Sequence, residues 1–459
     1  MTATSSLASD VLPPIAQCLG RTEGPGPAWL SPLRSQASAW VSEHGFPTRK
    51  HEDWRYLPLK AILETPFRPG ADEVDHQVMP RALGGLDSDL GGTRLVFVNG
   101  RLAPEWSRFG ELPEGVRVTS LAAVVAEAAE RLRPTWSRPY GHAFAALNAA
   151  LASDGAFVQL PADSVVEDPI ELVFWSDASD SPLLSIPRSV VLAGAGSRAS
   201  VVETYAGADG GLYCTNAVTE ITLANGARVE HHKVQDEARS AFHLASLQVH
   251  MGRASHFSSR SVALGGAIAR HEVEVHLGAE EAEVDLEGLY MPAGAQHHDN
   301  PILVDHAAPR CTSRQLYKGI VEGGGHGVFN GHVVVRPGAF GTDAAQTNKN
   351  LLLSERAEVD TRPRLEILAD DVMCTHGAAV GHLDEDALFY LRSRGIPREA
   401  ARGLLTFGFA QEMVQRWPPG PLRSRVERLV GARLGASGAG SDRGGLLPSS
   451  CNAPAGEAR

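Results

Sequence analysis

The sequence predicts a mainly β protein whose strand-rich centre is flanked by helical segments at both ends. Between about Ala156 and Leu353, short apolar segments alternate with turn residues, and no helical pattern interrupts them. Outside that stretch, apolar residues recur at the spacing of an amphipathic helix. The chain also holds 47 glycines and 29 prolines, and only 6% of its residues are aromatic. Such a composition favours many turns and few large helix-packing side chains.

Residues 1–152 are predicted to form a helical N-terminal region. Residues 35–44 fit a short helix that ends at Gly45. Residues 121–132 are rich in Ala and Glu, with apolar side chains at helical spacing, and residues 144–151 are a further helical candidate.

Residues 153–370 are predicted to form the β core. The alternation of apolar and polar residues is clearest in 271–277 and 282–287. Further strand candidates are 157–160, 170–175, 189–192, 201–205 and 218–223. The lack of intervening helices disfavours a βαβ sheet, but a sandwich, a barrel and a β-helix all fit the pattern. Asn225-Gly226 by itself is typical of a hairpin turn.

Residues 371–434 are predicted to be a helical C-terminal domain. Asp384 is placed to cap a helix over residues 385–391, which Gly395 then ends. Acidic residues at its start and basic residues at its end suit the helix dipole. Two more helices are expected over 397–405 and 422–434, and the Gly-, Ser- and Pro-rich residues 435–459 are predicted to be a disordered tail.

Composition and charge exclude several classes of function. The net charge of −12 and the lack of a basic run argue against nucleic-acid binding. No segment approaches the roughly 20 apolar residues of a membrane span, and the N-terminus has no signal-peptide pattern, so a cytoplasmic protein is expected. Five scattered cysteines without a CxxC pair form neither a disulfide framework nor a self-contained metal site.

The short string Asp370 to Gly377 holds the most interesting chemistry. Cys374 and His376 are two residues apart, so on an extended strand their side chains point to the same side. Thiolate and imidazole both bind iron or zinc. The alternative is a buried cysteine beside a hydrogen-bonded histidine. Two ligands hold only part of a cluster, so a second chain should complete a metal site here.

Other motifs are absent or weak. Gly323–Gly327 resembles a phosphate loop only loosely, and the chain has no GxxxxGK[ST] motif, so any ATP hydrolysis belongs to another subunit. No GxSxG, HExxH or dinucleotide fingerprint occurs. A histidine-rich group suggests a metal site, but with 18 histidines in the chain chance proximity explains it better: His297, His298, Asp299, His306, His326 and His332.

Several strings together resemble the SufB/SufD family of iron–sulfur cluster assembly proteins. The tryptophan-containing segment His51–Tyr56 resembles the N-terminal signature of the SufD type. Residues 298–320 and 346–354 resemble the family's central core. The strongest match runs from Pro363 to Gly395 and includes the Cys-Thr-His-Gly string, which is typical of the SufD type. The resemblance covers the chain from about His51 to Trp417.

The resemblance implies a right-handed parallel β-helix core with helical segments at both ends, which decides among the architectures left open above. In such a core, the apolar members of the alternating segments should face inward. These are Val273, Val275, Leu277, Val284 and Leu286.

The resemblance also implies a non-ATPase scaffold that works with a SufB-type subunit, which receives sulfur, and a SufC-type ABC ATPase. His376 matches the histidine implicated in cluster assembly at the interface with SufB, and Cys374 is a second candidate metal ligand. The iron–sulfur cluster would be transient and shared with the partner subunit. Some family complexes bind reduced flavin, but this sequence has no flavin motif.

The C-terminal helices match the region that docks the ATPase in this family. The predicted contact residues are Leu388, Phe389, Leu391, Arg392 and Arg394. Whether the free chain forms a homodimer is left open.

Three alternatives compete with this interpretation. A SufB-type subunit is the nearest, but the Cys-Thr-His-Gly string argues against it. A β-helix carbohydrate-active enzyme belongs to another class, and the sequence shows no catalytic carboxylate pair by spacing. A cupin-like metalloenzyme is suggested only by the histidines. Co-purification with an ATPase would favour the scaffold over both enzymes.

Overall fold

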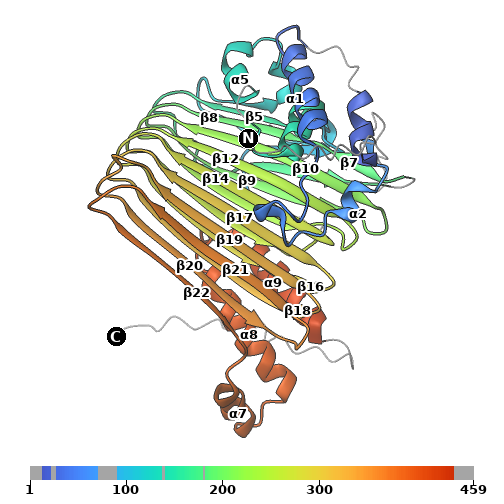
Figure 1. Ribbon diagram of the computed structural model, residues 1–459, viewed down its shortest axis with the longest axis vertical. Helices are drawn as coiled ribbons and strands as arrows, with labels where there is room; N and C mark the ends of the chain where they lie inside the picture. The colour runs from blue at the N-terminus through green and yellow to red at the C-terminus, as the bar shows by residue number, and fades with distance from the viewer. Residues whose placement is uncertain (1–12, 22–26, 71–89, 137–139, 179–180, 439–459) are drawn as a thin grey trace, which may run out of the picture.

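The computed structural model of the protein describes residues 13–21, 27–70, 90–136, 140–178 and 181–438. Its centre is an elongated stack of long strands that form two sheets (Figure 1). Sheet A runs in the order β4 (Arg117–Ser120), β5 (Ala156–Leu160), β8 (Arg188–Ala193), β10 (Tyr213–Leu223), β12 (Phe242–Met251), β14 (Ile268–Leu277), β17 (His297–His306), β19 (His326–Val335) and β21 (Glu358–Ile367), with β7 (Leu183–Ser185) and β1 (Arg68–Pro69) beside β10. Sheet B runs in the order β3 (Arg101–Leu102), β2 (Arg94–Val98), β6 (Ile170–Ser176), β9 (Arg198–Gly207), β11 (Arg228–Asp236), β13 (His256–Ala263), β15 (Glu283–Tyr290), β18 (Thr312–Gly323), β20 (Asp343–Leu352) and β22 (Met373–Gly381), with β16 (Ala293–Gly294) beside β18.

The chain winds as a parallel β-helix of about seven turns. Successive long strands alternate between the two sheets, and each pairs in parallel with the strand one coil later. Arg198 of β9 is in register with Arg228 of β11, which is in register with His256 of β13. The β-helix implied by the family resemblance is therefore confirmed, and the sandwich and the barrel are excluded.

The core lies between the two sheets and is built from the alternate residues of each strand. All five side chains predicted to face inward are at most 1% exposed and belong to one apolar cluster. Burial of each such Val or Leu side chain contributes about 1.5–3 kcal/mol. Because the side-chain period of a strand is two, a shift of one residue would move this whole set to the outside.

The corner that leads from sheet A to sheet B holds one residue with positive φ in each coil. In every coil but the last, the N–H group of this residue donates a hydrogen bond to a carbonyl of the following coil, for example Ala254 N–H to Glu280 O at 2.9 Å. The positions are Asp163, Gly196, Gly226, Ala254, Glu281, Arg310, Gly341 and Asp371, with φ between 51° and 69°. Asn225-Gly226 forms such a corner and not the predicted hairpin, because Gly226 N–H bonds to Arg253 of the next coil.

The N-terminal end of the β-helix is covered by helices and short strands. The helical pieces are η1 (Pro14–Arg21), α1 (Ser31–His44), η2 (Glu52–Trp54), α2 (Lys60–Leu63), η4 (Pro104–Trp106), α4 (Leu121–Val124), α5 (Ala129–Trp136) and α6 (Ala143–Leu151). Residues 1–152 are thus not helical only, because the buried strand β2 pairs in parallel with β6. The helix predicted over 121–132 is two helices, interrupted at residues 125–128, and both contribute to one apolar cluster with Phe157 and Val190 of sheet A.

The C-terminal region begins later than predicted. Strand β22 pairs in register with β20, so the β core continues to Gly381, past residue 370. Three helices follow, α7 (Glu385–Ser393), α8 (Arg398–Val414) and α9 (Pro421–Gly438). Asp384 caps α7 as predicted, because its carboxylate accepts the N–H groups of Asp386 and Ala387. Helix α9 takes in residues 435–438 of the predicted tail, and 439–459 lie outside the described residues.

Helices α8 and α9 pack on the outer face of sheet B, whereas α7 extends away from it (Figure 1). Ion pairs between the helices and sheet B fix this packing. Lys318 Nζ of β18 lies 2.6 Å from a carboxylate oxygen of Glu412 in α8, and Arg425 of α9 lies 2.6 Å from Glu171 of β6. Across the described residues, no helix is both long and apolar enough to span a membrane.

Candidate functional site

The C-terminal end of the β-helix is left open. β21 and β22 are the last strands of their sheets, and no further strand pairs with either among the described residues. Inward-facing apolar side chains are therefore exposed here, with Ile367 at 43% and Val380 at 47%. An uncovered strand edge and exposed apolar side chains together mark a surface on which another chain can pair.

Both sequence-predicted metal ligands lie on this last strand. In the register of β20 and β22, Cys374 is paired with Ala344 and His376 with Gln346. Both side chains therefore belong to inward-facing rows of sheet B. Cys374 is half-buried and packs against the core, whereas His376 is exposed. The structure thus places both side chains on one face, as the spacing predicts, at the end that no further coil covers.

The two side chains differ in their suitability as ligands. Burial raises the pKa of the Cys374 thiol above its ordinary value of 9.0, and the nearby Asp343 carboxylate raises it further. A protonated thiol is a poor metal ligand, since the thiolate is the binding form. His376 offers an imidazole in open solvent, which makes it the better candidate metal ligand of the two.

Two buried glutamines lie one and two coils beneath His376. Gln346 Nε2 donates to Gln315 Oε1 at 2.9 Å, and Gln346 Oε1 has no hydrogen-bond partner among the described residues. Sequence analysis did not identify these residues as part of the site. Both glutamines lie in segments that resemble the family's core, 298–320 and 346–354, but that resemblance carries no information about which side chains face inward.

Other histidines do not add ligands to this end. Alternation along the strands separates them, because His298 and His306 face the interior while His297, His326 and His332 face outward from sheet A. Within the described ranges, no group of three or more His, Cys, Asp or Glu side chains is arranged to hold a metal ion. Cys374 and His376 therefore remain the pair that this end presents.

A second surface is formed by α7 and α8. Of the predicted contact residues, Leu388 is buried and Leu391 half-buried, whereas Phe389 is 72% exposed, and Arg392 and Arg394 are exposed. Leu388 therefore supports the packing of the helices and does not offer a contact surface. The exposed apolar side chains that the sequence analysis missed are Tyr390, Leu404 and Phe407.

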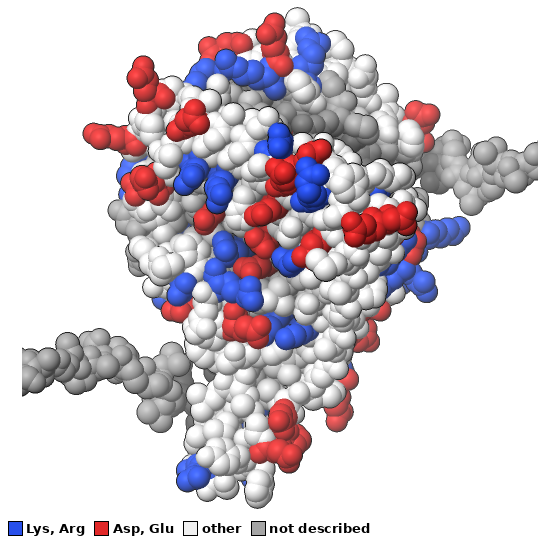
Figure 2. Space-filling view, turned by 90° about the vertical axis from the view of Figure 1, so that its left-hand side faces the viewer, with Lys and Arg blue, Asp and Glu red and all other residues white. Residues whose placement is uncertain are grey.

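Figure 2 shows how charge is distributed on one side of the molecule. Basic and acidic side chains are interspersed over the body, whereas the narrow lower part, where Figure 1 places α7, carries few of them. A projection with exposed aromatic side chains is typical of a protein-binding surface, and its exposed charges, among them Arg392 and Arg394, can add polar contacts at the rim.

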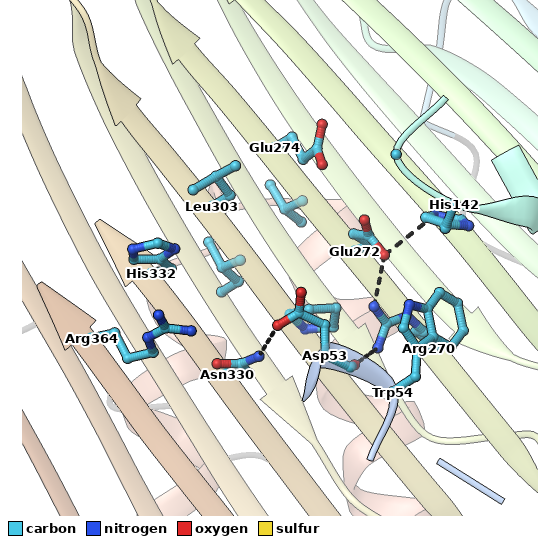
Figure 3. A pocket seen from close by; sticks show the side chains of 14 residues that line it. Asp53, Trp54, His142, Arg270, Glu272, Glu274, Leu303, Asn330, His332 and Arg364 are labelled. Atoms are coloured by element: carbon cyan, nitrogen blue, oxygen red, sulfur yellow. Dashed lines mark hydrogen bonds and ion pairs between the residues drawn. The ribbon is translucent and has the colours of Figure 1, made fainter. Parts of the chain in front are cut away.

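A separate hollow lies on the outer face of sheet A. It has a volume of about 160 Å³ and lies beneath η2 and residues Gly141 and His142 (Figure 3). Arg270 stacks on the Trp54 ring at 3.8 Å and donates to Glu272 at 2.8 Å and to Asp299 at 2.5 Å. This buried arginine fixes the HEDWR segment, which the sequence analysis identified only by resemblance, onto the β-helix.

Comparison with known proteins matches the chain to two family models. The SUF system FeS cluster assembly, SufBD core domain matches residues 174–409, and the SufBD protein N-terminal region matches residues 24–172. The iron-sulfur cluster assembly protein SufD of Escherichia coli K12 is 32% identical over 410 residues, which cover 88% of this chain and 93% of that protein. SufD of Bacillus subtilis 168 is 27% identical over 416 residues, covering 88% and 94%. A SufBD family protein of Synechocystis is 31% identical over 410 residues, covering 87% and 90%.

Proposed function

This chain belongs to the SufB/SufD family of iron–sulfur cluster assembly proteins, and we propose that it acts as a SufD-type scaffold subunit whose open β-helix end meets a SufB-type subunit. The observation that carries the proposal is the exposed His376 on the last, uncovered strand. A cluster assembled there would contact this chain and its partner at the same time.

The number of ligands explains why a partner is needed. An iron–sulfur cluster is usually held by four protein ligands, most often cysteine thiolates. This end offers one imidazole and one thiol whose pKa is raised. A SufB-type subunit would therefore supply the remaining thiolates. Because a neutral imidazole binds iron and later exchanges it, His376 suits the acquisition of iron and the release of a finished cluster.

The form of the open end supports docking of a second β-helix. The last strands present backbone N–H and C=O groups that find no strand partner among the described residues. A partner whose own edge strands pair with them would continue both sheets and cover Ile367 and Val380. The same edge could accept a second copy of this chain, which is the competing homodimer.

The α7–α8 surface supports docking of a SufC-type ATPase. The sequence has no Walker lysine motif, so hydrolysis of ATP falls to a partner. Phe389, Tyr390, Leu404 and Phe407 provide exposed apolar anchors, and Arg392 and Arg394 can pair with acidic groups. Truncation of an anchor of this kind typically costs about 2 kcal/mol or more of binding free energy.

The decisive experiment compares His376→Ala with Cys374→Ala in the co-expressed complex with SufB-type and SufC-type partners. After anaerobic reconstitution, iron content and cluster absorption per complex are measured. His376→Ala should lose most of its cluster, and Cys374→Ala should keep most of it. Thermal stability and complex composition should stay unchanged in both variants. Normal cluster assembly by His376→Ala would mean that the ligand role is wrong.

A third variant in the same system tests the ATPase surface. Phe389→Asp should weaken binding of the ATPase at least tenfold while the SufB-type partner stays bound. Phe109→Asp is the matched control, because Phe109 is another exposed phenylalanine and lies in the N-terminal region. Retention of the ATPase by Phe389→Asp would place the docking surface elsewhere.

A further inference from the structure

The hollow on sheet A has a floor that changes charge from one side to the other. Glu274 of β14 is in register with Leu303 of β17, then His332 of β19 and Arg364 of β21. One row of neighbouring side chains thus passes from an acid through an apolar residue to an imidazole and a guanidinium. All four line the hollow, as Figure 3 shows.

Most charges around the hollow already have partners. Glu272 pairs with Arg270 at 2.8 Å and lies 3.4 Å from His142 Nε2. The Asp53 carboxylate accepts a hydrogen bond from Asn330 Nδ2 at 3.1 Å. These contacts are internal and hold η2 in place.

Glu274 is the exception. It makes no hydrogen bond or ion pair with any residue that the structure describes, although it is half-buried. Burial and the neighbouring Glu272 raise the pKa of this carboxyl to about 7. Across the hollow, the Oδ1 atom of Asn330 is buried and likewise has no donor among the described residues. Glu274 thus offers an unused acceptor to the hollow, whereas Asn330 Oδ1 is enclosed by protein; a ligand with N–H donors would satisfy Glu274.

The opposite side offers donors. Arg364 lies 3.7 Å from Glu52, a single long contact that leaves most of its five N–H groups free for a carboxylate. His332 lies beside it, with its Nε2 atom 3.4 Å from Glu366. A ligand that carried only positive or only negative charge would satisfy one side and be repelled by the other.

The size of the hollow narrows the class of ligand further. Strands are spaced about 4.8 Å apart, so the backbones of β14 and β21, which carry Glu274 and Arg364, are separated by about 14 Å. The main chain of an amino acid with one hydrogen bond of about 2.8 Å at each end spans roughly 9 Å. The long side chain of Arg364 extends far enough to cover the remainder. The volume of about 160 Å³ is below the roughly 300–1,000 Å³ of pockets for drug-sized ligands and cofactors. A metal ion is disfavoured, because no suitable group of ligands occurs in the described part of the chain.

We propose that this hollow binds a small zwitterion of the α-amino acid class, with its ammonium group on Glu274 and its carboxylate on Arg364. The ligand's side chain would lie over Leu303 and Pro301. Since Asp53 and Trp54 form one wall, a bound amino acid would also tie the N-terminal segment to four successive strands of sheet A.

The test uses the purified full chain without partners, so its outcome does not depend on cluster assembly. Glycine, L-alanine, L-leucine and L-glutamate are titrated by calorimetry, with thermal shift as a second readout. N-acetyl-L-alanine lacks the ammonium group and L-alaninamide lacks the carboxylate. At least one free amino acid should bind, and both derivatives of alanine should bind at least tenfold more weakly than the parent.

Variants then locate the site. Glu274→Gln and Arg364→Gln should each weaken binding at least tenfold with the melting temperature of the free protein unchanged. Glu283→Gln, an exposed glutamate on sheet B, is the matched control and should bind normally. The proposal is overturned if no amino acid binds at millimolar concentration. It is equally overturned if the amide binds as well as the amino acid, or if the two variants bind like the wild type.

Discussion

The two ends of the β-helix carry the same kind of inward-facing apolar residue, but in the described part of the chain only the N-terminal end is covered. At the N-terminal end, β2 and β4 and the helices around them close the core, and Phe97 is fully buried against Phe174. At the C-terminal end, Ile367 and Val380 remain exposed although their strands follow the same alternation. The exposure thus comes from the missing next coil, and the difference marks the open end as the place where another chain would bury apolar surface.

The largest effect on stability is expected at the closed end. Phe97→Ala should lower the free energy of unfolding by about 3–5 kcal/mol, because it leaves a cavity in a fully packed core. Val380→Ala at the open end should cost less than about 1 kcal/mol. Chemical denaturation of both variants measures the contrast. Equal losses would show that the open end is packed as tightly as the closed one.

The open end should instead affect association. Val380→Asp should change the free energy of unfolding by no more than about 0.5 kcal/mol, as for other exposed positions. It should weaken binding of the SufB-type subunit, and any homodimer of the free chain, at least tenfold, because a charge would enter the buried interface. Val165→Asp is the control, since Val165 is similarly exposed near the other end. Calorimetry and analytical ultracentrifugation give the two affinities.

Two buried histidines, His298 and His306, predict that the stability of the fold depends on pH. Burial lowers the pKa of His298 to about 3 and that of His306 to about 4. Their unfolded pKa of about 6.5 is higher, so the unfolded chain binds more protons. Stability should therefore be complete above about pH 6.5 and fall as the pH drops towards 4, by up to about 1.4 kcal/mol per pH unit for each histidine. His306→Gln should flatten this slope, and an unchanged slope would remove His306 from the explanation.

The smallest effect is expected at the corners between the sheets. Ala254 has φ of 51° at a position where the preceding coil has glycine, Gly226. Ala254→Gly should raise the free energy of unfolding by about 0.5 kcal/mol, and Gly226→Ala should lower it by about 1 kcal/mol. Thermal denaturation of the two variants tests whether the corner conformation, and not local packing, sets these values.

Local patterns in the sequence predicted much of this structure. Alternation identified the inward residues from Val273 to Leu286, and the position of Asp384 identified the start of α7. Both features depend on neighbours within a few residues. The parallel pairing of strands about 30 residues apart left no local signal, so the β-helix itself followed from the family resemblance.

The features that the sequence did not predict depend on tertiary packing and on the register between strands of different coils. Leu388 and Tyr390 are similar in the sequence pattern, but only packing decides that the first is buried and the second exposed. Glu274 and Arg364 are 90 positions apart and line one hollow because three parallel registers bring them into one row. No local pattern contains those registers, so the hollow on sheet A was not predictable from the sequence.

The number of turns sets the length of the β-helix. Each added turn lengthens the β-helix by one strand spacing, about 4.8 Å, and leaves the faces of all other strands unchanged. The distance from Trp54, which is held on Arg270, to the open end is therefore set in whole strand spacings by the number of turns between them. Insertion of a complete turn would move His376 along the axis of the β-helix and keep it on the same face. Insertion of one residue in β22 before His376 would turn its side chain to the opposite face.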